Sequence, residues 1–177
     1  MNLRVVIING TGASGKDTFV MYCGGHGSVY NLSTIDRVKE AAKVLGWRGD
    51  EHDKSPEARH FLSDIKDSWV RFNNGSFTDV TYRVARILAD PIEELEGDIP
   101  VFFIHAREPE EIQKLKRHYG DIAVTLIVKG RDSGEGQTNH ADLNVDNYPY
   151  AYEVDNSGTL EELNEKARIF MQEILNV

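Results

Sequence analysis

The feature that most constrains this chain lies at its start, where the apolar run VVII at 5–8 leads into the segment NGTGASGKDT at 9–18. Consecutive β-branched residues are typical of a buried strand, and residues 15–23 follow a helical pattern. Between the two, glycine and small residues let the backbone fold around an anion, with successive N–H groups and the start of the helix facing it. The sequence therefore predicts a strand, an anion-binding loop and a helix in that order.

The loop has the spacing of the phosphate-binding pattern G-x-x-x-x-G-K-[ST], with Asp17 in place of the final hydroxyl residue. Lys16 is predicted to neutralise charge on a transferred phosphate. Because a serine or threonine normally ligates Mg²⁺ at position 17, Asp17 and Thr18 are the candidate metal ligands. A glycine-rich turn with a chance lysine is the structural alternative. We expect the whole loop to hold the phosphates of a nucleotide, through Gly10, Thr11, Gly12, Ala13, Ser14, Gly15, Lys16, Asp17 and Thr18.

The rest of the chain alternates strand-like and helical segments, the pattern of an α/β protein with a parallel sheet of about five strands. A chain of 177 residues suits one domain, so we predict a single three-layer domain over 1–177 with helices on both faces of the sheet. Strands are expected at 3–9, 28–32, 99–105, 122–128 and 151–155, and helices at 15–23, 36–46, 56–72, 77–96, 108–118 and 159–175. Ser55 is predicted to cap the helix at 56–72, and residues 159–162 are predicted to form a capping box. The core-facing stripe of the last helix is expected to consist of Leu160, Leu163, Ala167, Phe170 and Ile174.

Composition limits the partners. The formal net charge of −9 argues against binding a nucleic-acid polymer, but it is compatible with a small phosphorylated ligand held by a few cations. Cys23 is the only cysteine, so a reducing, cytoplasmic setting is expected. No apolar stretch approaches the roughly 20 residues of a membrane span. Neither a Ser-His-Asp order nor a zinc-like Cys/His spacing can be assembled, which disfavours hydrolase and structural-zinc functions.

Charged residues next to a predicted strand end are candidates for contact with a substrate. Asp36, Arg37 and Lys39 begin a helix just after the second strand, near the carboxyl edge of the sheet where ligands of α/β proteins bind. Asp36 could orient a hydroxyl group or a magnesium-bound water, and Arg37 or Lys39 could contact an acceptor phosphate. The alternative is a solvated helix start with Asp36 as its N-cap.

A second group follows the strand at 99–105. Arg107 is predicted to clamp a phosphate, because its planar, permanently charged fork can donate two hydrogen bonds to one anion; an ion pair with a neighbouring glutamate is the alternative. His105 stands where a Walker-B strand would end in an aspartate that holds Mg²⁺, and we expect a strand-end histidine with structural partners. On the middle helices, Arg59 is the best candidate for an acceptor pocket. Three aromatic residues of that region are expected in the core: Trp69, Phe72 and Phe77.

Six blocks occur in a fixed order: SGKDT at 14–18, IDRVKEAA at 35–42, IHAREPEE at 104–111, VKGR at 128–131, NHAD at 139–142 and DNSGTL at 155–160. Together they resemble the phage-type deoxynucleoside monophosphate kinase family, and the resemblance covers most of the chain. Asp17 is then a family trait, since the family's loop is similar to S-G-K-D-T. Arg107 is in register with the arginine of the family's D-V-R-F-P-N-E block, in which His105 replaces the aspartate.

The resemblance implies a P-loop kinase fold with ATP and Mg²⁺ at the loop and a (deoxy)nucleoside monophosphate as acceptor, bound by a helical region at about 34–96. Asp36 and Lys39 carry over as acceptor residues, and Arg59 resembles an arginine of the family's R-x-x-L-Q helix. Arg131 would belong to a lid at about 130–147 that closes over the phosphates. Two residues would lie near the adenine, Asn156 and Gly158.

The predicted activity is therefore ATP-dependent phosphoryl transfer to a small phosphate-bearing acceptor, with Lys16, Arg107 and Arg131 as catalytic residues. One alternative is a kinase for another phosphorylated metabolite, of the dephospho-coenzyme A or phosphomevalonate type. Another is a nucleotide-binding sensor without turnover, which His105 in the Walker-B place motivates. The sequence leaves open whether the chain forms a homodimer.

Overall fold

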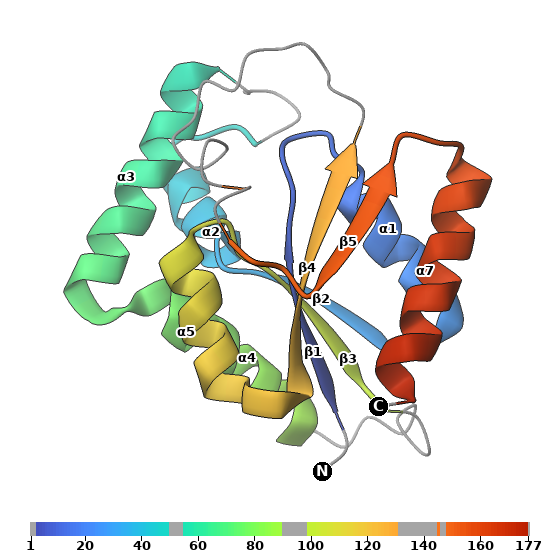
Figure 1. Cartoon of the computed structure of the whole chain (residues 1–177). Helices are drawn as coiled ribbons and strands as arrows, with labels where there is room; N and C mark the ends of the chain where they lie inside the picture. The colour runs from blue at the N-terminus through green and yellow to red at the C-terminus, as the bar shows by residue number, and fades with distance from the viewer. Residues whose placement is uncertain (1–2, 50–54, 90–98, 131–144, 146–147, 177) are drawn as a thin grey trace. The chain divides into compact units, whose positions relative to one another are not determined.

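The computed structural model describes residues 3–49, 55–89, 99–130, 145 and 148–176 of the chain (Figure 1). The chain divides into two compact units, one formed by residues 1–31 and 91–177 and the other by residues 32–90. The loop at 10–18 belongs to the first unit. The second unit covers most of the region at 34–96 for which acceptor binding is predicted.

Five strands form one sheet in the order β2-β3-β1-β4-β5. Their bounds are β1 (Arg4–Asn9), β2 (Val29–Ser33), β3 (Val101–His105), β4 (Ala123–Gly130) and β5 (Tyr152–Asn156). β1 pairs in parallel with both β3 and β4, and β4 pairs in parallel with β5. Ile8 lies opposite His105 in this register, so β1 and β3 end at the same edge of the sheet, where the loop begins. The predicted parallel sheet of about five strands is confirmed.

Among the described residues of the first unit, three helices cover the sheet: α1 (Lys16–Cys23), α5 (Pro109–Tyr119) and α7 (Leu160–Leu175), with short 3-10 turns η1 (Gly24–His26) and η3 (Gly120–Ile122). α1 packs beside α7, whereas α5 packs against β1 and β4 from the other side (Figure 1). Side chains of a strand alternate between the two faces of a sheet. Because four consecutive side chains of β1, residues 5–8, are fully buried, both faces are covered and the three-layer arrangement is confirmed.

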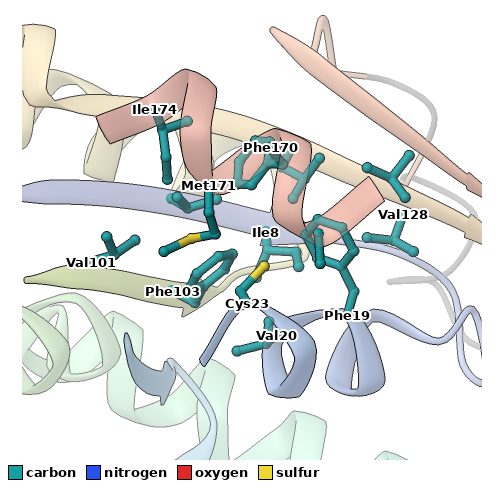
Figure 2. Close-up of a cluster of buried hydrophobic side chains, with 14 of the residues drawn as sticks. Ile8, Phe19, Val20, Cys23, Val101, Phe103, Val128, Phe170, Met171 and Ile174 are labelled. Carbon is teal, nitrogen blue, oxygen red and sulfur yellow. The ribbon is translucent and has the colours of Figure 1, made fainter. Parts of the chain in front are cut away.

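The core between the sheet and the α1–α7 face is centred on aromatic side chains (Figure 2). The ring of Phe170 lies 5.6 Å from that of Phe19 and 5.2 Å from that of Tyr152, both in edge-on contact. Edge-to-face pairs of this kind contribute about 0.5–1.5 kcal/mol beyond the burial of their area. These rings fix α1 and α7 to each other, and α1 follows directly from the loop.

Helix starts follow the capping patterns of the sequence. Thr159 Oγ1 accepts a hydrogen bond from the N–H of Glu162 at 3.2 Å, and the Glu162 carboxylate accepts one from the N–H of Thr159 at 2.9 Å. This reciprocal capping box, predicted from residues 159–162, opens α7. The buried stripe of the helix begins one turn later than the sequence pattern indicates, at Leu163, because Leu160 in the first turn is 60% exposed.

The second unit contains α2 (Asp36–Val44), α3 (Pro56–Asn73) and α4 (Gly75–Ala89). Ser55 caps α3 as predicted, accepting a hydrogen bond from the N–H of Ala58 at 3.1 Å. A small core of apolar residues joins α2 to α3: Val38, Ala42, Trp47, Ala58 and Leu62. The predicted continuation of α4 to residue 96 lies outside the described residues.

Within the parts of the chain that the structure describes, no helix is both long and apolar enough to cross a membrane.

Candidate functional site

The loop between β1 and α1 is folded as an anion cradle. Ala13 and Gly15 both have left-handed backbones, with φ of 62° and 86°, and the N–H of Ser14 donates to the carbonyl of Thr11 at 3.2 Å, which closes a turn over residues 11–14. In turns of this kind, successive backbone N–H groups can converge on one anion. A non-glycine residue at positive φ costs about 1–3 kcal/mol, so the surrounding structure must hold Ala13 in this conformation.

β4 and β5 hold the loop in place. The side-chain amide of Asn156, at the end of β5, donates to the carbonyl of Ser14 over 3.0 Å. A Cβ on Gly130 would lie 2.7 Å from the Cα of Ser14, and a Cβ on Gly15 would overlap the Asn156 amide. A side chain at position 130 would therefore move the loop backbone, and one at position 15 would displace the Asn156 amide. Gly158 lies against the capping box, because a Cβ there would overlap the carboxylate of Glu162.

A buried asparagine joins the loop to the strand ends beside it. Asn9 is 1% exposed at the end of β1, and its side-chain oxygen accepts from the N–H of Gly10 at 2.8 Å. Its amide nitrogen donates to the carbonyl of Arg107 at 3.1 Å and to the hydroxyl of Tyr150 at 2.7 Å. The Tyr150 hydroxyl in turn donates to the carbonyl of Val145 at 3.0 Å. Asn9 thus fixes the first residue of the loop relative to the backbone that carries Arg107.

Charged and polar side chains gather around the last part of the loop. Lys16 Nζ lies 3.2 Å from Oδ2 of Asp17. Oδ1 of Asp17 lies 3.8 Å from Nδ1 of His105, whose side chain is 11% exposed. The other ring nitrogen of His105, Nε2, lies 2.7 Å from Oδ1 of Asn31 on β2. The prediction that His105 is a strand-end histidine with a structural partner is confirmed by this contact.

These features fit the phosphates of a nucleotide. The N-cap of α1 is Gly15, which has no side chain to cap the N–H groups of the first helical turn, and those groups lie at the positive end of the helix dipole. Ser14 Oγ is buried and makes no hydrogen bond within the described residues. Lys16 adds a positive charge at the same place. A cradle of backbone donors with one lysine is what a polyphosphate requires.

The candidate metal ligands fit a divalent cation in part. The Asp17 carboxylate is 74% exposed and supplies the oxygen atoms that hard cations prefer; Thr18 is half-buried in the next position of α1. Among the described residues, no group of three or more His, Cys, Asp or Glu side chains could form a metal site. A cation bound here would therefore depend on phosphate oxygens or water for most of its coordination.

The structure describes only one of the two arginines that are predicted to be catalytic. Arg107 is half-buried just after β3, and Asn9 holds its backbone carbonyl. The backbone of Arg107 thus lies beside Asn9 at the start of the loop, and its role toward a phosphate stays a prediction. Arg131, together with the predicted lid at 130–147 apart from Gly130 and Val145, lies outside the described residues.

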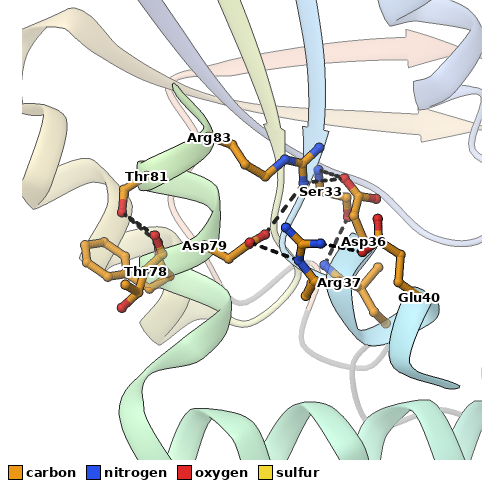
Figure 3. A network of polar contacts seen from close by, with 10 residues as sticks. Ser33, Asp36, Arg37, Glu40, Thr78, Asp79, Thr81 and Arg83 are labelled. Carbon is orange, nitrogen blue, oxygen red and sulfur yellow. Dashed lines mark hydrogen bonds and ion pairs between the residues drawn. The ribbon is translucent and has the colours of Figure 1, made fainter. Parts of the chain in front are cut away.

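In the second unit, the predicted acceptor residues of α2 form part of a network of ion pairs with α4 (Figure 3). Arg83 Nη1 donates to Oδ2 of Asp36 at 2.8 Å, and Arg37 Nε donates to Oδ1 of Asp79 at 3.3 Å. Arg37 also donates to Glu40 at 2.6 Å. The hydrogen bonds that Arg37 donates to Asp79, first, and to Glu40, second, raise the pKa of Arg37 above its usual value. The network anchors Arg37 to α4.

The alternative that Asp36 is the N-cap of α2 is wrong. Ile35 occupies the N-cap position and Asp36 is the first helical residue. Its carboxylate accepts from the N–H of Ser33 at 2.9 Å as well as from Arg83, so it fixes the turn between β2 and α2. Lys39 is half-buried on α2, and Arg59 is exposed on α3.

A groove of about 670 Å³ lies between α2 and α3 in this unit. Its polar side chains are Arg37, Asp64 and Ser68, and its aromatic side chains are Phe61, Trp69 and Phe72. Phe72 is 84% exposed rather than in the core as predicted, because it lies in the last turn of α3 at the rim of the groove. Trp69 is half-buried and packs against the small core of this unit.

Sequence reasoning missed the polar residues that position others. Asn9 holds the carbonyl of Arg107. Asn31 contacts His105, and Asp79 contacts Arg37. Asn9 did carry a signal, since a polar residue directly after four buried apolar ones needs hydrogen-bond partners. Asp79 carried none, because on a helix surface most carboxylates are simply solvated.

No protein-family model and no curated protein sequence matches the chain. Solved structures do match its fold. A sugar kinase from a Janibacter species aligns with a TM-score of 0.52 at 16% identity, over 97% of this chain and 95% of that one. APE1195 aligns with a TM-score of 0.51 at 14% identity, over 98% and 97%. At such identities the likeness shows the fold alone: the chain shares the three-layer α/β fold of these structures.

Proposed function

We propose that this protein transfers the γ-phosphoryl group of ATP to a small phosphate-bearing acceptor, most specifically a (deoxy)nucleoside monophosphate. The observation that carries the proposal is the loop itself, in which left-handed Ala13 and Gly15 lead into a helix without a side-chain cap beside Lys16. Phosphoryl transfer needs little from a protein beyond positioning and charge stabilisation, and this loop offers both to a polyphosphate.

On the donor side, residues 10–18 would hold the phosphates through backbone N–H groups, and Lys16 would neutralise charge on the group in transfer. Asp17 is the better placed of the two candidate metal ligands, since its carboxylate lies among Lys16 and His105. A divalent cation, Mg²⁺ in most such kinases, would screen charge on the phosphates when bound. Asn156 would act by holding the Ser14 carbonyl, and Gly158 stays the candidate beside the adenine.

On the acceptor side, Arg107 would bind the acceptor phosphate or the developing charge, and Arg131 would join it from the lid. In the second unit, the groove between α2 and α3 combines aromatic rings with one arginine and one carboxylate. A flat base can stack on aromatic rings while its phosphate pairs with an arginine. This combination favours a nucleotide acceptor over a sugar phosphate, whose hydroxyl groups need many more polar partners. The acceptor residues proposed there are Asp36, Arg37, Lys39 and Arg59.

The direct test is a coupled assay of ADP release over a panel of ribo- and deoxyribonucleoside monophosphates, with dephospho-coenzyme A and phosphomevalonate as rival acceptors. Lys16→Ala should abolish turnover and leave the far-UV circular dichroism unchanged. Arg117→Ala, which removes an exposed cation of α5, is the matched control and should be silent. Full activity in the Lys16 variant would refute the proposed role of the loop in phosphoryl transfer. Activity with dephospho-coenzyme A or phosphomevalonate alone would identify that compound as the acceptor instead of a nucleoside monophosphate.

A nucleotide sensor without turnover is the second candidate. It is favoured by His105, which stands at the end of β3 in the place of the usual acidic residue and contacts Asn31 instead. Tight ATP binding with no ADP formed over the whole panel would support the sensor and exclude the kinase.

A further inference from the structure

Ser14 is enclosed by neighbouring backbone, but the peptide that follows it keeps one rotation. Ser14 is 2% exposed, and its N–H donates to the carbonyl of Thr11 at 3.2 Å. A Cβ on Gly130 would lie 2.7 Å from the Cα of Ser14, and a Cβ on Gly10 would lie 2.6 Å from its Oγ. These contacts hold the atoms of Ser14 itself. The plane of the Ser14–Gly15 peptide can still turn over, because that movement changes only ψ of Ser14 and φ of Gly15.

Glycine at position 15 permits both directions of this peptide. The observed φ of Gly15 is 86°. Turning the plane over would bring φ to roughly −90°, and glycine adopts either sign of φ about equally readily. Residue 15 therefore does not select the observed direction, and a neighbouring group has to do so.

The side-chain amide of Asn156 is that neighbour. Its nitrogen donates to the carbonyl of Ser14 over 3.0 Å. The C=O and N–H of a trans peptide point in opposite directions, so the N–H of Gly15 points away from Asn156. With the plane turned over, the N–H of Gly15 would face the donor nitrogen of Asn156, and the carbonyl would take its place on the other side.

The N–H of Gly15 belongs to the group of donors that a polyphosphate needs. The first hydrogen bond of α1 runs from the N–H of Phe19 to the carbonyl of Gly15, so the N–H groups of residues 15–18 have no partner within the helix. They carry partial positive charge at the start of α1, whereas a carbonyl turned to the same side would present partial negative charge to the phosphates.

We propose that Asn156 is a positioning residue: it keeps the Ser14–Gly15 peptide in its anion-binding direction and thereby sets the affinity of the loop for phosphates, instead of contacting the adenine. The inference rests on the proposed nucleotide binding at residues 10–18. It makes the loop a two-state element, in which one side chain from β5 selects the state that binds.

A ligand with phosphates and no base separates the two roles of Asn156. Dissociation constants for inorganic tripolyphosphate and for ATP are measured by isothermal titration calorimetry. Asn156→Ala should weaken both ligands by the same factor, about tenfold, the scale of one hydrogen bond. Asn156→Asp should weaken both further, also at high salt that screens its charge, because a carboxylate only accepts hydrogen bonds and favours the reversed peptide. Asn164→Ala, on an exposed position of α7, is the matched control and should change neither.

The wild-type protein reports the direction of the peptide without a substitution at 156. Serine labelled with ¹³C at the carbonyl and glycine labelled with ¹⁵N make only Ser–Gly amides visible in an HNCO spectrum. The chain has three such pairs, at 14–15, 133–134 and 157–158, and the signal that Ser14→Ala removes is that of 14–15. Tripolyphosphate should move this amide proton downfield, because the N–H then donates to a charged oxygen.

The outcomes distinguish the inference from the proposed function. If ATP binds the wild type but Asn156→Ala weakens ATP alone, or tripolyphosphate does not bind, or the 14–15 amide proton does not move with it, the inference is overturned and the proposed function stands. If ATP does not bind the wild type, both are overturned. The labelling experiment keeps Asn156 in place, so a poorly folded variant at 156 cannot obscure the result.

Discussion

The contact between Gly15 and Asn156 predicts a measurable coupling between two substitutions. Gly15 has φ 86° and ψ 10°, so alanine there costs about 1–2 kcal/mol for the left-handed backbone. The new Cβ would also overlap the Asn156 amide and break the hydrogen bond from that amide to the carbonyl of Ser14. Loss of this bond costs about 1 kcal/mol more. We expect Gly15→Ala to lower the free energy of unfolding by about 2–3 kcal/mol.

Asn156→Ala removes the same hydrogen bond and should cost about 1 kcal/mol. In the double variant the bond can be lost only once, and the overlap disappears with the amide. The double variant should therefore cost about 2–3 kcal/mol rather than the 3–4 kcal/mol of the summed single effects, a coupling of about 1 kcal/mol.

Urea unfolding followed by far-UV circular dichroism measures these differences. Gly46→Ala is the matched control for the backbone strain, because Gly46 also has positive φ, 101°, but a Cβ there would meet nothing within 4 Å. Asn164→Ala, on an exposed position of α7, is the control for the amide. Both tryptophans, Trp47 and Trp69, lie in the second unit, so fluorescence reports whether the effect is confined to the first. Strict additivity of the two single changes would refute the contact between residue 15 and Asn156.

Three further outcomes follow from the site and the core. Arg107→Ala should lower kcat/KM for the acceptor at least tenfold, about 1.4 kcal/mol, with Arg107→Lys intermediate because it keeps the charge without the fork; a loss of stability alone would make the arginine structural. Asp79→Asn should raise the KM for the acceptor several-fold while the affinity for ATP stays constant, because the carboxylate that holds Arg37 is neutralised. An unchanged KM would show that the ion pairs between α2 and α4 do not support acceptor binding. Burial raises the pKa of Cys23 to about 12, so the thiol stays protonated in the folded protein above pH 9 while the unfolded chain ionises. Stability should therefore fall as pH rises from about 9 toward 12 in the wild type and less so in Cys23→Ala, and Ellman's reagent at pH 8 should label only the unfolded protein.

Local patterns in the sequence were sufficient to predict the positions of the strands and helices. The five expected strands and most helix ends agree with the structure within a few residues, since the apolar runs and the caps at Ser55 and Thr159 depend on neighbours along the chain. The same reasoning misplaced Leu160 and Phe72, which have the right periodicity but lie in the terminal turns of their helices. Burial at a helix end depends on what the helix packs against, and a periodic pattern does not contain that information.

The sequence by itself determined that this protein has a strand, an anion-binding loop and a helix at its start, because glycine and lysine spacing acts within one short segment. Only the tertiary structure decided what supports the loop and what faces it. Asn156 reaches Ser14 from 142 positions away along the chain, and His105 meets both Asn31 and Asp17 from another strand. These contacts depend on strand order and parallel register, which bring distant residues to one edge of the sheet. For that reason the anion-binding loop was predictable from sequence, whereas the contacts that Asn156 and His105 make with it were not.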